Sequence, residues 1–345
     1  SRKEVEKSKG GSARYWEIEF QAAEAEEKEY RDKVVKLEEK YRAEDGNDFN
    51  VFFANVETMK PILFNRTPKP DVRPKLKSIK DRLSLQTSIM LETALDYSCG
   101  EYDFDEAMES SRDDRLIGGR GVARVLYDVT MIDREEQIET INPVTGELSL
   151  VTQINEEIGE QSLEIVYVNR EDYLQSPARK WRDVRWVAFR HTPTREEAVK
   201  QFGEIAEDIP LNYQVINNDV NKNAENSEVF KRAEIWEIWD KQTLSRKWFV
   251  KGFPKLLGED EDPYGLEQFF PMPKPLLGIT TNGTMVPVPD YDEYRKQAIV
   301  VEETTSKIDS LTEQLQVKGL YSMVSEEIEK LINQTTDKFI PVLNI

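Results

Sequence analysis

The side chains best suited to nucleophilic catalysis are scarce in this chain. Its 345 residues include one histidine, His191, and one cysteine, Cys99. A catalytic thiol or hydroxyl needs a neighbouring base and an acid that orients that base. Cys99 lies in a predicted helix without an activating pattern, and His191 ends a predicted strand, as a structural histidine would. We therefore predict no catalytic residue and no enzymatic activity.

Carboxylates are the other groups that could carry chemistry. Glu234, Glu237 and Asp240 lie on one predicted hairpin, where they could form a catalytic dyad or hold Mg²⁺. The chain has 66 acidic residues, so such groupings arise by chance, and we favour that interpretation. The stretch "GEDEDPYG" (residues 258–265) lacks the alternation and the terminal glutamate of a calcium loop. We expect no metal site and no cofactor.

A glycine-rich stretch, "RLIGGRGVARVLYD" (residues 115–128), raises the question of phosphate binding. A phosphate-binding loop follows a strand and opens a helix, so that backbone N–H groups at the helix start face the anion. Here the order is reversed, because a helical segment precedes the glycines and an alternating strand follows them. Gly118 or Gly119 is expected to end the helix in the left-handed conformation. The stretch therefore predicts a helix-to-strand turn and no nucleotide site.

The charge balance restricts the class of partner. A formal net charge of −19 argues against non-specific wrapping of DNA, which needs many Lys and Arg contacts to phosphate. A group of tryptophans with intervening basic residues could stack single-stranded bases, but we favour cross-strand aromatic packing. The group consists of Trp181, Trp186, Trp236, Trp239 and Trp248. No run of 18 apolar residues exists, so no membrane-spanning helix is expected.

The first part of the chain reads as helical. Residues 16–41 show an apolar seam at steps of three and four, interrupted at Glu27, which predicts a long amphipathic helix. A second helix is predicted over residues 49–65, kinked or ended by Pro61. Residues 65–74 should be extended, and helix should resume near Lys75 and run to Arg115 with a break near residues 99–100.

The middle of the chain is rich in predicted strands. Residues 121–129 alternate, residues 136–154 read as a hairpin, and residues 161–168 and 183–191 are further strands. Thr194 and Glu197 form a capping box that starts a short helix ending at Gly203. A second hairpin over residues 233–252 turns near residues 241–243, and residues 217–228 are predicted to be a mobile loop. Helical and strand segments in succession indicate an α+β fold.

A long helix is predicted over residues 290–317, about 42 Å in length. Its apolar stripe is thin: Tyr291, Tyr294, Ala298, Val301, Ile308 and Leu315. Its opposite face is polar: Asp292, Lys296, Glu303, Ser310 and Gln314. Such a helix cannot bury itself in one small domain and needs neighbours on its flanks, most simply copies of itself.

Six stretches, in order, resemble the portal proteins of tailed double-stranded DNA bacteriophages, particularly the short-tailed, podovirus type. They are "NVETMKPILFNRTPKPDV", "DDRLIGGRGVARVLYD", "DYLQSPARKWRDVRWVAFRHTPTREEAVKQFG", "EIWEIWDKQT", "DPYGLEQFFPMPKPL" and "PVPDYDEYRKQAIVVEETTSKIDSL". They run from about residue 50 to residue 320. Each motif is modest by itself, and the ordered set is specific.

The resemblance implies a domain plan. Residues 1–45 would be an N-terminal amphipathic helix, residues 46–289 a wing of helices and β-hairpins, residues 290–317 the first stem helix, and residues 318–345 the start of a clip. The family pattern continues with a second stem helix, a return to the wing and a crown, so we expect this sequence to be a portion of a longer chain. In this family the clip docks other proteins, and its candidate docking residues here are Lys318, Tyr321, Glu326 and Lys330.

The resemblance also implies function and location. It implies a ring of about twelve subunits at one capsid vertex of the virion, assembled in the host cytoplasm, with a channel through which duplex DNA is packaged and ejected. The partners would be sister subunits, the large terminase subunit, the head-to-tail adaptor, and the major capsid and scaffolding proteins, with no membrane. The alternative is an adaptor or scaffold protein of a viral particle without a channel.

The charge of the chain agrees with a channel through which DNA slides. Twelve copies at −19 give a ring on the order of −230, which repels phosphate within roughly 8 Å at physiological salt. We therefore expect the polar face of residues 290–317, including Lys296, Glu303 and Gln314, to line the channel or face the clip. Ile299, on the same arc, weakens that assignment.

Overall fold

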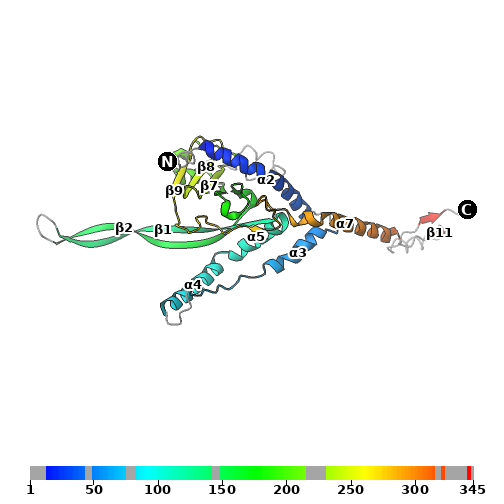
Figure 1. Ribbon diagram of the computed structural model, residues 1–345, viewed down its shortest axis with the longest axis horizontal. Coiled ribbons are helices and arrows are strands. Elements are labelled where there is room, and N and C mark those ends of the chain that lie inside the picture. Colours follow the sequence, from blue (N-terminus) through cyan, green and yellow to red (C-terminus); the bar gives the residue numbers. More distant parts are fainter. Residues whose placement is uncertain are drawn as a thin grey trace.

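The chain folds as a mixed α+β protein, as the sequence predicts. The structure is a computed structural model that describes residues 13–42, 49–74, 82–141, 148–214, 231–314, 320–322 and 340–342. Figure 1 shows a central body, a β-hairpin that projects from one end, and a helix that projects from the other. The predicted loop at residues 217–228 lies outside the described residues.

Helix α2 (Ala13–Tyr41) forms as the apolar seam predicts and spans two parts of the body (Figure 1). Its first half packs Trp16 and Phe20 onto Trp186, Trp236 and Phe249 of a sheet. Its second half lies against helices α3 (Val51–Leu63) and α5 (Phe104–Gly118). The apolar seam of α2 therefore joins the sheet to helices α3 and α5.

Five antiparallel strands form that sheet, in the order β3 (Tyr173–Gln175), β4 (Trp186–His191), β7 (Ile235–Asp240), β8 (Ser245–Val250) and β9 (Gly258–Glu261). The β7–β8 turn falls at residues 241–244, where the sequence places it. Strand β7 is buried along its whole length, because α2 covers one face of the sheet and further apolar clusters cover the other.

The tryptophans of the sheet pack on neighbouring aromatic rings. Trp186 stacks on Phe20 with 5.2 Å between ring centroids, and Trp239 meets Phe269 edge-on at 5.5 Å. Trp181, which is half-buried, packs on Phe270 at 5.5 Å. The tryptophans thus serve aromatic packing, but these ring partners belong to α2 and to the segment of Phe269 and Phe270, instead of to neighbouring strands as the sequence predicted.

Strands β1 (Arg120–Ile141) and β2 (Leu148–Val168) form one continuous antiparallel ribbon. The two arms of the hairpin predicted over residues 136–154 pair as expected, but the sequence predicted the flanking segments as separate strands, and that division was wrong. The strands stay in register from Val122 opposite Val168 to Ile141 opposite Leu148, with one bulge at Thr130 and Met131. A bulge shifts the register of two paired strands without ending their pairing, so β1 and β2 remain hydrogen-bonded on both sides of it. Strand β10 (Leu276–Leu277) adds to the base of β1.

The turn that opens β1 is the one that the glycine stretch predicts. Helix α5 (Phe104–Gly118) ends at Gly119, whose φ of 88° is left-handed. Helix α4 (Arg82–Glu101) precedes α5, and the break between them falls at Tyr102 and Asp103 instead of residues 99–100. Gly100 stays helical, because the reversal is made by Asp103 in a left-handed conformation (φ 45°).

The shorter helices follow local signals. Helix α3 (Val51–Leu63) begins at Asn50, whose side chain accepts a hydrogen bond from the Phe53 N–H. It runs two residues beyond Pro61, because a proline in the last turn removes only one helical hydrogen bond. Helix α6 (Arg195–Phe202) begins at the predicted Thr194–Glu197 capping box and ends at Gly203.

Several small elements complete the fold. They are the 3₁₀ turns η1 (Arg170–Asp172), η2 (Trp181–Asp183) and η3 (Gly203–Ala206), the strand pair β5 (Tyr213–Gln214) and β6 (Lys231–Arg232), and the parallel pair β11 (Leu320–Ser322) and β12 (Ile340–Val342). The Pro-rich segment before helix α7 (Asp290–Gln314) is held by packing, since Phe269, Phe270, Met272 and Met285 all join one apolar cluster.

Candidate assembly site

Helix α7 (Asp290–Gln314) corresponds to the predicted stem helix and is rooted in the body by its first three turns. Asp290 pairs with Arg115 of α5 at 2.6 Å, and Tyr291 is buried against Phe52 of α3 with 4.7 Å between ring centroids. The acidic first turn suits the positive end of the helix dipole.

The anchored part of α7 ends near Glu302. Ala298 is buried in the cluster that α2, α3 and α5 share, and Glu302 pairs with Lys40 at 2.9 Å while also accepting the Val51 N–H at 3.3 Å. Tyr291 and Ala298, which the sequence assigned to packing between subunits, are therefore buried within their own chain.

Beyond Glu302 the helix leaves the body (Figure 1). Its large apolar side chains there lie in water, with Ile308 56% and Leu311 58% exposed. Val300 and Val301, about two turns before Ile308, are exposed as well. A helix whose apolar flank finds no cover in its own chain needs a partner on that flank.

The predicted channel-lining residues share one arc of α7. Lys296, Glu303 and Ser310 are exposed and seven residues apart, which places them on one face. Asp292 begins the same arc, half-buried and 3.8 Å from Lys33 of α2, and Gln314 is the last residue of the helix. From Lys296 to Ser310 this arc lies on a different side of α7 from Tyr291 and Ala298, so it faces away from the body.

Most of the other predicted site residues lie near or beyond the end of the described part of α7. Leu315, Lys318, Glu326 and Lys330 lie outside the described residues. Tyr321 is placed at the backbone level only, in β11, which pairs with β12. Tyr294 is half-buried beside Tyr291, with 5.3 Å between ring centroids.

The residues considered for catalysis have structural partners. His191 Nε2 lies 2.8 Å from Glu237, which is buried and also accepts hydrogen bonds from Arg124 at 2.8 Å and Trp239 at 2.9 Å. Burial opposes ionisation of Glu237, but the hydrogen bond to His191 and the charge of Arg124 outweigh it and hold the pKa at about 2. His191 and Glu237 thus form part of a structural charge network.

The three carboxylates of that hairpin do not converge. Asp240 pairs with buried Lys247 at 3.1 Å, and Glu234 accepts the Trp236 indole N–H at 2.8 Å. Their spacing of three residues places successive side chains on opposite faces of the sheet. Among the described residues no group of histidine, cysteine and acidic side chains could hold a metal ion.

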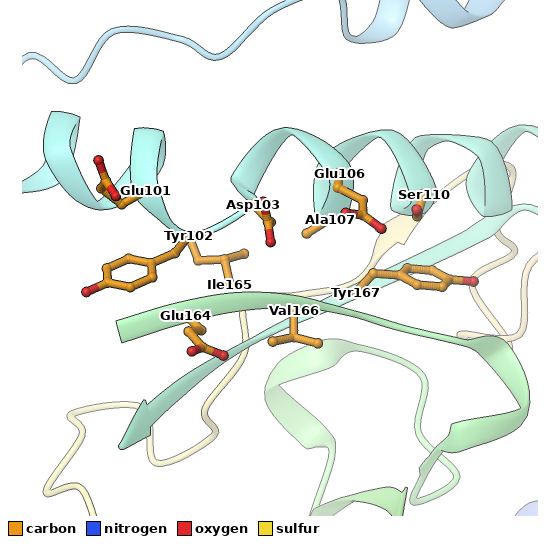
Figure 2. A pocket seen from close by; sticks show the side chains of 10 residues that line it. All are labelled: Glu101, Tyr102, Asp103, Glu106, Ala107, Ser110, Glu164, Ile165, Val166 and Tyr167. Carbon is orange, nitrogen blue, oxygen red and sulfur yellow. The ribbon is translucent and has the colours of Figure 1, made fainter. Parts of the chain in front are cut away.

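A further acidic hollow of about 440 Å³ lies between the α4–α5 junction and β2 (Figure 2). Figure 2 shows the carboxylates of Asp103 and Glu106 on the side of the helix that faces β2, whereas Glu101 points away. Glu164 of β2 adds a fourth carboxylate. Tyr167 also lines the hollow, and its hydroxyl donates to Asp114 of α5 at 2.6 Å, a hydrogen bond that joins β2 to α5.

The pH dependence of stability tests the contact between Asp114 and Tyr167. Burial raises the pKa of Asp114 from 3.8 to about 6, so between these values the folded chain binds more protons than the unfolded chain. Stability therefore falls as the pH rises from about 4 to about 6. We expect Asp114→Asn to raise the free energy of unfolding at pH 7.5 by about 1–3 kcal/mol and to change little at pH 4. Urea unfolding at both pH values measures this, and an equal effect at both would contradict it.

Sequence reasoning missed the buried ion pair that joins α2 to β1. Arg120 Nη2 lies 3.0 Å from Glu27, which Arg31 also contacts at 3.0 Å, and both Arg120 and Glu27 are buried. The signal was present, since Glu27 occupies a seam position of α2. The partner could not be identified, because Arg120 lies 93 residues away.

Neither protein-family models nor curated proteins match this sequence. Within the helices that the structure describes, none is both long and apolar enough to span a bilayer.

Proposed function

We propose that this chain is a subunit of a phage portal ring, in which copies of α7 stand side by side around a channel for duplex DNA. The observation that carries the proposal is the free part of α7, which has an uncovered apolar flank and a polar arc that faces away from the body. The ordered resemblance to portal proteins supports the same assignment. The ring would act at a capsid vertex, with terminase and the head-to-tail adaptor docking beyond residue 317.

In a ring, each side of the projecting part of α7 would face a different environment that suits its side chains. The apolar flank would lie against the next α7, where its burial gives about 25 cal/mol per Å². The polar arc would face water and the DNA, where the net charge of −19 per subunit prevents tight phosphate binding. Heterologous contacts of this kind close into rings when the rotation between subunits permits.

The size of the assembly that the purified chain forms tests the proposal directly. Negative-stain images and mass photometry of the purified chain should show rings near twelve subunits, or a population of rings of similar size. A steady monomer or dimer at micromolar concentration would favour the non-channel adaptor. Because the adaptor would use the same amphipathic helices for docking, only the assembly state separates the two.

The polar arc provides a second prediction. Lys296→Glu should change the rate at which packaged DNA leaves the particle by at least about threefold, because a ring of positive charge becomes negative. The matched control is Arg295→Glu, which makes the same change one residue away on a different face of α7. DNA retention measured at two salt concentrations should separate the variants, and identical behaviour would remove Lys296 from the channel wall.

A further inference from the structure

Glu302 lies where three helices meet. Its carboxylate pairs with Lys40 Nζ at 2.9 Å and accepts the Val51 N–H at 3.3 Å. These contacts join the last turn of α2 and the first turn of α3 to α7. Figure 1 shows the ends of α2 and α3 meeting α7 where that helix leaves the body. Glu302 therefore marks the point at which α7 becomes free.

Asn50 extends this junction. Its Nδ2 donates to the Lys40 carbonyl at 2.8 Å, and its Oδ1 accepts the Phe53 N–H at 3.0 Å. The Lys40 carbonyl is in the last turn of α2 and the Phe53 N–H is in the first turn of α3, where helices leave such groups unpaired. Lys40, Asn50, Val51 and Glu302 together form a clasp that binds α2, α3 and α7.

The charges of the clasp suit the helix ends that they face. Lys40 is in the last turn of α2 and Glu302 lies at the first turn of α3, so each charge meets a helix end of opposite sign. Burial opposes the charge of Lys40, but its hydrogen bonds to Glu302 and Tyr291 outweigh burial and raise its pKa above the ordinary value. The two side chains are only 31% and 20% exposed, so water and salt screen their attraction only in part.

A second ion pair holds the start of α7. Asp290 pairs with Arg115 of α5 at 2.6 Å. Asp290 and Glu302 are separated by about 18 Å along the helix and by about 120° round it. Between them the buried side of α7 carries Tyr291 and the small side chain of Ala298. The helix is therefore fixed at two points on different sides, and loss of the clasp would leave it free to turn about its first turns.

The free part of α7 magnifies any such movement. The helix spans about 30 Å from Asp290 to Ser310, so a turn of about 10° about Asp290 moves Ser310 by about 5 Å. Asp309 lies on the same side of α7 as Tyr291 but is exposed, so the body gives no support there. The direction of the free part thus depends on the clasp.

Closure of a ring is sensitive to that direction. Neighbours in a closed ring are related by one fixed rotation, about 30° for twelve subunits and about 28° for thirteen. Contacts between bodies and contacts between α7 helices must obey the same rotation. A change of a few degrees in the direction of α7 therefore favours a different ring size or an open assembly.

We propose that the clasp sets the direction in which α7 leaves the body and thereby the number of subunits in the ring. The first half of this inference concerns the single chain, and the second half rests on the proposed ring. Lys40 and Glu302 act as positioning residues, because the effect needs no contact of either side chain with DNA.

Single-molecule fluorescence energy transfer tests the direction of α7 at picomolar concentration, where the chain is unassembled. In a Cys99→Ser background, dyes are attached at Ala25→Cys on α2 and Ser310→Cys on α7, which are both exposed positions. The parent should give one narrow distribution of distances. Lys40→Met and Glu302→Gln should each shift or widen that distribution by at least about 3 Å.

Matched variants show whether the ion pair is responsible. Lys36→Met is the control, because Lys36 is an exposed lysine one turn earlier on α2, and it should leave the distribution unchanged. Lys40→Arg keeps a positive charge beside Glu302 and should keep the distribution narrow. Lys40→Met combined with Glu302→Gln should be no broader than either single variant, since both break one pair. Unchanged distributions in both single variants would overturn the inference.

The distribution of ring sizes tests the second half. Images of the assembled wild-type chain give the fraction of rings that have the commonest size. In Lys40→Met that fraction should fall at least about twofold, with larger, smaller or open forms in its place, whereas Lys36→Met should resemble wild type. A Lys40→Met chain with a widened distance distribution and unchanged ring sizes would overturn the link to subunit number.

The outcomes also separate this inference from the proposed function. If the wild-type chain forms no ring at any concentration, the proposed function fails, while the distance measurement still decides the role of the clasp. If rings form and Lys40→Met changes neither measurement, the clasp is wrong and the ring stands. Far-UV circular dichroism of each variant confirms that helix content is unchanged before distances are compared.

Discussion

Replacing Gly121 with alanine is expected to destabilise the folded chain by at least about 3 kcal/mol. A Cβ atom at this position would lie 1.9 Å from the Ser111 carbonyl oxygen and 2.7 Å from its carbon. Both are backbone atoms of α5, so no flexible side chain can move aside. Either α5 or the base of the β1–β2 ribbon must shift.

The clash would also break a neighbouring contact. The Ser111 hydroxyl donates to the Val122 carbonyl at 3.1 Å, and that bond ties α5 to β1 directly beside Gly121. Moving the two elements apart removes this bond and loosens the packing of Leu116 and Val122. Urea unfolding followed by circular dichroism measures the loss of free energy.

Gly100→Ala is the matched control. This glycine lies within α4, and no atom lies within 4 Å of the position of an added Cβ. Alanine there should stabilise by about 0.5–1 kcal/mol, because glycine is the weaker helix former. Equal effects of the two substitutions would contradict the close approach at Gly121.

Breaking the buried ion pair should have the second large effect. Arg120→Met leaves Glu27 buried with only Arg31 as a charged partner, and removing one partner of a buried pair costs about 3–5 kcal/mol. Burial opposes ionisation of Glu27, but the charges and hydrogen bonds of Arg120 and Arg31 together outweigh it and keep the pKa of that carboxyl below its ordinary value. Without Arg120 the same burial would raise the pKa.

The double variant Glu27→Leu with Arg120→Met separates loss of a pair from loss of packing. With both charges removed no buried charge remains, so most of the lost stability should return. Arg73→Met is the control, because the Arg73–Asp71 pair is exposed and its loss should leave the melting temperature unchanged. A double variant no more stable than Arg120→Met would show that the guanidinium is needed for packing.

The pair also bears on assembly. Arg120 follows the turn at Gly119 and binds α2, whose last turn holds Glu302 of α7 through Lys40. The root of α7 is thus fixed by contacts that reach the sheet. Loss of the Arg120 pair should therefore lower ring assembly together with stability, and the double variant should restore both.

Local features of this fold could be predicted from the sequence, because neighbouring residues determine them. The α2 seam, the Thr194 capping box and the Gly119 turn depend on contacts within about four residues or on one residue's φ preference. The polar arc of α7 follows from the same periodicity, since residues seven apart share a face. The α+β class follows from the order of such segments.

The long-range contacts and the burial of individual side chains depend on the tertiary structure alone. Glu27 was visible as a break in the seam, but its partner Arg120 is brought to it by the fold, and the β1–β2 ribbon became continuous because distant alternating segments share one register. Whether Tyr291 or Ile308 is buried depends on how far α2 and α3 reach along α7. Burial is a property of pairs of surfaces, and a sequence specifies each surface without specifying what covers it.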